Sequence, residues 1–158
     1  MPNQIELINA YLAGPNELRA AVTGMTAEQL KARPVAGKWS TLEVVCHLAD
    51  FDPILADRMK RIISLDSPQL LGADEQHFAR QLAYHDRDLE EELTLIELTR
   101  RQMGRILGAL PSEAFERAGV HNERGRLTLA DMVGIAARHI PHHVQFIEAK
   151  RRALGLPA

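Results

Sequence analysis

Histidine is the residue type with the clearest chemical potential in this sequence, and its seven copies are unevenly placed. His139 and His143 lie four positions apart in a segment with helical periodicity, so both imidazoles would lie on one face of a helix, about one turn apart. Two nitrogen ligands from one rigid helix suit a divalent metal ion. The pair His139 and His142 is also geometrically possible, and Pro141 between them predicts a kink. The spacing therefore indicates a candidate metal site without choosing between the two pairs.

His47 is the candidate for a third ligand, because no other histidine lies well inside another long predicted helix. Three neutral imidazoles would leave coordination positions open to water or substrate, which is typical of catalytic rather than structural sites. Asp50, near the same helical face as His47, could orient an imidazole or accept a proton. A surface carboxylate fits that position equally well. If His142 or Asp50 completed the coordination shell, the metal would instead be purely structural.

The remaining reactive side chains have simpler interpretations. Cys46 precedes His47, so its side chain points about 100° away around the helix, and we expect a core thiol. His121 lies in a polar loop that could fold over the mouth of a bundle, whereas His77 and His85 are expected to face solvent. We expect four helical arginines to be mostly solvated, although one of them could bind an anionic substrate. These are Arg58, Arg61, Arg100 and Arg101.

Four long amphipathic segments must position these side chains. They span about 4–22, from the capping box at 40–43 to the apolar Ile62, 89–110 and 128–153. Four such helices predict an all-α fold, a four-helix bundle. The long connection over 64–87 permits a crossover between the second and third helices.

Prolines and polar stretches predict the irregular parts of the chain. We expect Pro15 to bend or break the first helix and Pro53 to kink the second, because proline lacks a backbone donor. Short helices are predicted near 26–29, 74–84 and 112–115, and residues 117–127 read as a polar loop or a short irregular hairpin.

Composition narrows the class of protein. The length of 158 residues favours one domain over 1–158, with an aliphatic core because aromatic residues make up only 4%. The net charge of -2 argues against nucleic acid as a main partner. No apolar run is long enough for a membrane span, and the start lacks the pattern of a signal peptide. With Cys46 as the single cysteine, we expect a cytoplasmic protein in a reducing compartment.

Two segments resemble the signatures of the DinB/YfiT-like superfamily. The first is GKWSTLEVVCHLAD over 37–50, where a Trp-Ser pair precedes a helix start and a His-Leu-x-Asp. The second is RHIPHHVQFI over 138–147, with the pattern H-x-x-H-H-x-x-x-I. Stretches over 68–72, 86–88 and 119–125 also resemble this family, so the resemblance spans roughly residues 35–150.

The resemblance implies a bundle with a long connection after the second helix, and a divalent metal ion (zinc, nickel or iron) held by His47, His139 and His143. It places His142 off the site or at its rim. Members of the superfamily include thiol-dependent transferases and a maleylpyruvate isomerase that uses a low-molecular-weight thiol. The resemblance also implies a homodimer. Pro53 and Pro141 depart from the family pattern and bear on the ligand geometry.

Together these features predict a metal-dependent enzyme that acts on a small molecule. We expect a thiol-dependent S-transferase, or a related transferase or hydrolase, with a low-molecular-weight thiol as a further cofactor. The sequence contains neither a serine-nucleophile G-x-S-x-G motif nor a phosphate-binding G-x-x-x-x-G-K-[ST] loop. The alternative is a non-catalytic stress-response or binding bundle that carries a vestigial metal site.

Overall fold

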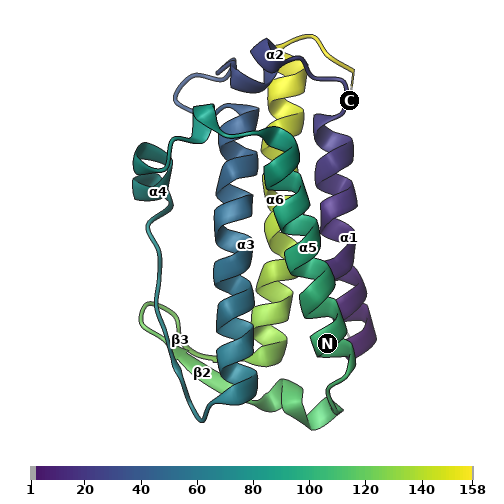
Figure 1. Ribbon diagram of the computed structural model, residues 1–158, viewed down its shortest axis with the longest axis vertical. Coiled ribbons are helices and arrows are strands. Elements are labelled where there is room, and N and C mark those ends of the chain that lie inside the picture. The colour runs from purple at the N-terminus through teal and green to yellow at the C-terminus, as the bar shows by residue number, and fades with distance from the viewer. Residues whose placement is uncertain (1–2, 158) are drawn as a thin grey trace.

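Four long helices form the body of the computed structural model, which describes residues 3–157 (Figure 1). They are α1 (Gln4–Val22), α3 (Thr41–Ser64), α5 (Leu89–Gly108) and α6 (Leu129–Ala153). Helix α1 packs against α5 and α6, and α3 packs against the same two helices, so the predicted four-helix bundle is confirmed. The outermost residues of the predicted domain, 1–2 and 158, lie outside the described residues.

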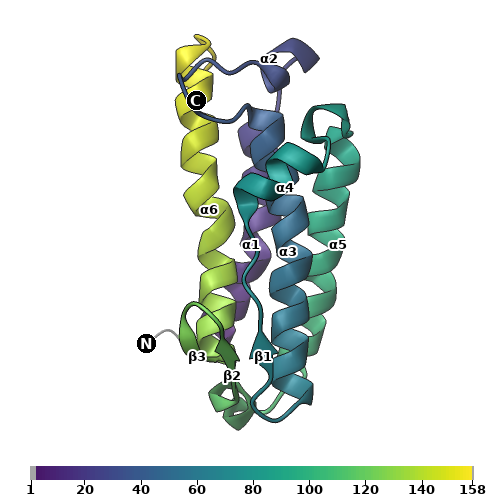
Figure 2. The same ribbon diagram turned by 90° about the vertical axis from the view of Figure 1, so that its left-hand side faces the viewer.

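The order of the helices requires a crossover. In Figure 1, α1 and α6 run upward whereas α3 and α5 both run downward. Consecutive helices α3 and α5 therefore point the same way, and the chain between them must return along the length of the bundle. Figure 2 shows this connection climbing beside α3, and it carries β1 (Gln69–Leu70), α4 (Glu75–Gln81) and the 3₁₀ turn η1 (Tyr84–Asp86). The predicted crossover between the second and third long helices is confirmed.

A small sheet ties the connection to the chain before α6. Strands β2 (Ala118–His121) and β3 (Gly125–Thr128) form an antiparallel hairpin, which the sequence analysis offered as one of two possibilities. Strand β1 pairs with β2 in parallel, with Gln69 opposite Val120 and Leu70 opposite His121. This pairing was not predicted, because two residues are too few to show the alternation that identifies a strand.

Local side-chain bonds fix where the helices begin. Full capping boxes open α1, α3 and α6, and a fourth opens the short helix α2 (Ala27–Lys31). At α3, Ser40 accepts a hydrogen bond from the backbone of Glu43, and the Glu43 carboxylate accepts one from the backbone of Ser40. These signals are local in sequence, which is why the helix starts were predictable. A 3₁₀ turn, η2 (Ser112–Glu116), follows α5.

The prolines do not break the helices. Pro15, Pro53 and Pro141 all lie inside continuous helices, so the break considered at Pro15 is wrong. Pro15 has no N–H to donate to the carbonyl of Tyr11 four residues earlier, and Arg100 from α5 donates to that carbonyl instead. Tertiary contacts thus satisfy a group that the local sequence leaves without a partner.

Two arginines that were expected to be solvated are buried instead: Arg58 is 9% exposed, and Arg100 is fully buried. The Arg100 guanidinium donates to both carboxylate oxygens of Asp52 in α3 and to the carbonyls of Tyr11 in α1 and Ala136 in α6. Gly14 makes room for it, because a Cβ atom there would lie 2.6 Å from Arg100 Nη1. One arginine therefore links all four long helices.

No helix in the described part of the chain is both long enough and apolar enough to cross a membrane. The interior is mainly aliphatic, as the composition predicted, and is built from the apolar faces of the long helices.

Candidate metal centre

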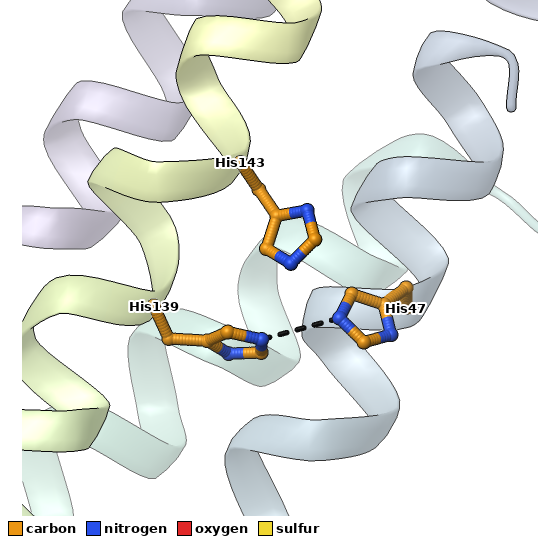
Figure 3. A group of neighbouring side chains, drawn as sticks. All are labelled: His47, His139 and His143. Atoms are coloured by element: carbon orange, nitrogen blue, oxygen red, sulfur yellow. Dashed lines mark hydrogen bonds between the residues drawn. The ribbon is translucent and has the colours of Figure 1, made fainter. Parts of the chain in front are cut away.

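Three histidines from two helices converge inside the bundle (Figure 3). His47 comes from α3, and His139 and His143 come from successive turns of α6. Nε2 of His47 lies 3.1 Å from Nε2 of His139, and one ligand nitrogen from each of the three residues lies within 4.8 Å of the others. Two nitrogens bound to one tetrahedral ion at the usual bond length are about 3.4 Å apart. The spacing therefore suits a single divalent ion.

The surroundings keep all three imidazoles neutral. Burial, followed by the charge of His143, lowers the pKa of His47 to about 3. Burial and the charge of His47 lower the pKa of His139 to about 3, and burial and His142 lower that of His143 to about 4. Neutral imidazoles offer the lone pairs that a metal ion requires, so the protonation state fits metal binding near neutral pH.

The second nitrogen of each ring has no hydrogen-bond partner in the described part of the protein. Nδ1 of His47, His139 and His143 is buried, and none has a hydrogen-bond partner among residues 3–157. Buried polar atoms without partners are costly and uncommon. These rings are held mainly by packing, and attraction to a shared ion would offset the cost of burying them.

Aromatic rings enclose one side of the cluster. The ring of Phe51, one turn after His47 on α3, lies 4.6 Å from the His47 ring, centroid to centroid. The Trp39 ring, just before the cap of α3, lies 5.3 Å from the His47 ring. Apolar walls of this kind exclude bulk water and strengthen electrostatic interactions at the site.

A carboxylate from the crossover faces the histidines. Glu75, the first residue of α4, places Oε2 3.7 Å from Nε2 of His47, and its side chain is 50% exposed. No spacing in the chain relates Glu75 to His47, so its place beside the histidines was not predicted from the sequence. The crossover alone brings α4 over the face of α3 (Figure 2).

A cavity of about 330 Å³ opens from the histidine cluster. His47, His139 and Glu75 line it together with Phe51, and residues of the hairpin close its far side. Its size suits a small molecule.

The structure places His142 and Asp50 away from the group. His142 is exposed on α6 and is not one of the three converging residues, so the pair of His139 and His143 is the one that converges. Both oxygens of Asp50 accept hydrogen bonds from Arg87, at 3.0 and 2.8 Å. That pairing holds the carboxylate against the end of the crossover, and the catalytic role expected for Asp50 finds no geometric support among the described residues.

The structure confirms the expected surroundings of some of the other cysteine and histidine candidates and corrects those of others. Cys46 is a buried core thiol that contacts the carbonyl of Tyr84, and burial raises its pKa to about 12. His77 is exposed as expected, but His85 is only half-exposed and lies within 2.9 Å of the hydroxyl of Ser40. His121 is buried with 4% exposure and lines the cavity, although it is not one of the three converging histidines.

Sequence comparison places the chain in a known family. Residues 10–147 match the sequence model of the DinB superfamily. The chain belongs to the DinB superfamily. The family assignment predicted from the two signature segments is therefore confirmed.

Members of this superfamily with metal-related names are similar over most of the chain. A protein of Oceanobacillus iheyensis named "Putative metal-dependent hydrolase OB0782" is 30% identical over 142 residues, which is 90% of this chain and 82% of that protein. A similarly named protein of Bacillus licheniformis is 27% identical over 89% of this chain and 81% of its own length.

A solved DinB-like structure has the same architecture. YfiT from Bacillus subtilis, described as a probable metal-dependent hydrolase with an unusual four-helix bundle topology, superposes with a TM-score of 0.91 at 25% identity. The match covers 98% of this chain and 89% of YfiT. These relatives and the three-histidine cluster together support a metal-dependent enzyme.

Proposed function

We propose that this DinB-superfamily chain is a metal-dependent hydrolase of a small molecule, in which His47, His139 and His143 hold a divalent ion. The observation that carries the proposal is the convergence of three neutral imidazoles beside the carboxylate of Glu75. Zinc, nickel or iron would suit three nitrogen ligands with a position left open.

Each group has a distinct part in this reaction. When bound, a divalent ion lowers the pKa of coordinated water and deprotonates a coordinated thiol. The three histidines would hold the ion, and two of them, His47 and His139, line the cavity. Glu75 is placed to accept the proton of the attacking water and to return it to the leaving group. Phe51 and Trp39 shield the reacting groups from bulk water.

Thiol-dependent S-transfer is the second candidate, and the position of Cys46 shapes it. Cys46 is buried with a raised pKa, so the chain's own thiol is unsuited to attack and the thiol must come from a small molecule. The cavity provides an entry for such a cosubstrate. A thiol bound to the ion would release its proton to solvent, so Glu75 would be dispensable for S-transfer.

Metal content tests the first half of the proposal. The wild-type protein, dialysed after loading with zinc or nickel, is expected to retain about one ion per chain. His47→Ala, His139→Ala and His143→Ala should each lose most of it, as measured by elemental analysis. His142→Ala is the matched control on the same helix and should retain the ion. Equal metal content in all variants would contradict the proposed ligands.

Activity of the loaded protein tests the second half and separates the two candidates. We expect hydrolysis of chromogenic esters or amides to fall by about 10²-fold or more in Glu75→Gln, with metal content unchanged, while the exposed Glu113→Gln behaves as wild type. Transfer of a small thiol to a chromogenic electrophile that survives in Glu75→Gln would favour S-transfer. A loaded protein without either activity, whose melting temperature falls on chelation, would point to a structural ion.

A further inference from the structure

The cavity beside the histidines contains a second set of polar groups that the proposed reaction does not use. Arg58 of α3 lies on the same helical stripe as His47 and Phe51, about 16 Å further along the helix axis from His47. The hairpin contributes His121 from β2 and Arg124 from its turn. Cationic and donor groups thus gather at the end of the cavity away from the three histidines.

Arg58 is a buried cation with an incomplete set of partners. Its residue is only 9% exposed, and one terminal nitrogen, Nη2, donates to the carbonyl of Leu71. Nε of Arg58 is buried without a hydrogen-bond partner among residues 3–157, and within that range the carboxylates of Glu123 and Asp57 attract the guanidinium only from beyond ion-pair distance. Burial, followed by the charge of Arg124, lowers the pKa of Arg58. A guanidinium nevertheless stays charged in proteins.

Other buried arginines show how this chain usually satisfies such a group. Arg100 is paired with both oxygens of Asp52, and Arg151, which is as buried as Arg58, donates to three backbone carbonyls. Leaving the nitrogens of a buried guanidinium without partners is unfavourable. Arg58 differs from both by facing a cavity, where a bound molecule can supply the missing anion.

His121 adds a neutral donor to the same end. Its Nδ1 accepts a hydrogen bond from the backbone N–H of Glu123 at 3.2 Å, so in the neutral ring the proton is on Nε2. No residue in the described part of the chain accepts from Nε2. An oxyanion between Arg58 and His121 could therefore accept hydrogen bonds from both.

Two carboxylates also line the cavity, but neither forms an ion pair with Arg58. Glu75 faces His47. Glu123 attracts Arg58 only from beyond ion-pair distance, and its carboxylate lies against Gly72, where a Cβ atom would be 2.9 Å from Oε1. The cavity thus has a reacting end at the histidines and a cationic end at the hairpin.

We propose that this cavity binds a small molecule that carries a carboxylate or phosphate group, with the oxyanion held by Arg58, His121 and Arg124 and the reacting bond directed toward the three histidines. The orientation rests on the proposed function, whereas the oxyanion site does not require it. Planar guanidinium groups bind both kinds of oxyanion through paired hydrogen bonds.

Calorimetric titration with inorganic phosphate and with succinate tests the site. Chelator-treated wild-type protein is expected to bind at least one of them. The anion that binds more tightly shows whether the natural ligand carries a phosphate or a carboxylate group. Arg58→Gln should weaken binding by about tenfold or more, since each charge-assisted bond contributes substantially. Arg124→Gln, at an exposed position, should weaken binding less, and Arg101→Gln, also at an exposed position, should leave it unchanged.

The outcomes separate this site from the metal centre. Absence of binding in the wild type would overturn the oxyanion site. Binding as tight as that of the wild type in both Arg58→Gln and Arg124→Gln, with folding verified by circular dichroism, would also overturn it. Repeating the titration with His143→Ala removes a proposed metal ligand without touching the cationic end. Phosphate or succinate binding that persists in His143→Ala would support an oxyanion site that is independent of the metal centre. If the wild type also retained no metal after loading, the proposed function would be refuted while the oxyanion site would stand.

Discussion

Individual buried charges organise this molecule as much as its apolar core does. Arg100 bonds Asp52 and two backbone carbonyls, and its guanidinium also lies 4.5 Å from the centre of the Tyr11 ring. Burying a charge is costly unless its partners are complete, and here the hydrogen-bond set draws on all four long helices. Arg58 lacks such a set, because its Nε is buried without a hydrogen-bond partner among residues 3–157.

Replacing Arg100 is therefore expected to destabilise the fold severely. Arg100→Met should lower the free energy of unfolding by about 3–5 kcal/mol, because Asp52 remains buried without a partner. Urea denaturation followed by circular dichroism measures the change. The double variant Arg100→Met with Asp52→Leu should recover part of the loss, since it removes the isolated charge. A single variant within 1 kcal/mol of wild type would show that the pair is not structural.

The sequence predicted single residues only where their partners are near in the chain or belong to a known pattern. His139 and His143 are related by one helical turn, and the family signatures brought His47 to the same site. Arg100 was wrongly expected to be solvated, and Glu75 was not predicted at all. Their partners, Asp52 and His47, are far away in sequence. No local pattern distinguishes a helical arginine that faces the core from one that faces solvent.

At the scale of the elements, a helix cap fixes the start of α3, the helix that carries His47. The cap of α3 lies two turns before His47, and the carboxylate of Glu43 is 8% exposed there. Burial opposes ionisation of Glu43, yet hydrogen bonds from Arg33 and from the Ser40 backbone outweigh burial and lower its pKa. The charged cap therefore stabilises the folded state.

The contribution of this cap should depend on pH in a defined direction. Because the pKa of Glu43 is lower in the folded than in the unfolded chain, its stabilisation is present above the ordinary value of 4.5 and is lost as the pH falls through the folded pKa. Glu43→Gln should thus cost about 1–2 kcal/mol at neutral pH, and the cost should shrink toward pH 4. Denaturant titrations of both proteins at several pH values measure it. A constant difference would contradict the role of the charge.

Elements with local signals were predictable, and those made by tertiary contact were not. The capping boxes at Ser40 and Thr128 marked two helix starts correctly. The break considered at Pro15 does not occur, because Arg100 of another helix donates to the Tyr11 carbonyl that Pro15 leaves without a donor. The pair 69–70 becomes a strand only because β2 lies beside it.

On the scale of the whole molecule, two of the four long helices, α3 and α6, supply the three histidines, while the crossover and the hairpin supply most of the remaining site. Gly72, Ala73 and Glu75 reach the cavity from the crossover, and His121 and Arg124 reach it from the hairpin. The long crossover is therefore needed to complete the cavity, because a short loop between α3 and α5 could not cover the face of α3 that carries His47 (Figure 1). The predicted homodimer and cytoplasmic location stay predictions.

The junction of crossover and hairpin is the point where this arrangement can be tested. Gly119 of β2 lies so close to the crossover that a Cβ atom would be 2.9 Å from the carbonyl oxygen of Pro68. Two hydrogen bonds flank the contact, from the Val120 amide to Pro68 at 2.8 Å and from the Asn122 amide to Leu70 at 3.1 Å. A backbone oxygen cannot move aside as a flexible side chain can.

Gly119→Ala should consequently separate the hairpin from the crossover while leaving the bundle folded. We expect hydrogen exchange at the amides of Val120 and Asn122 to accelerate, since these amides lose their partners, whereas the central amides of α3 and α6 stay protected. Gly108→Ala is the matched control, because a Cβ atom there meets nothing within 4 Å. If the junction holds the cavity closed, Gly119→Ala should also weaken oxyanion binding without changing metal content. Unchanged exchange at both amides would mean that the junction tolerates a methyl group, and the crossover would then need another anchor.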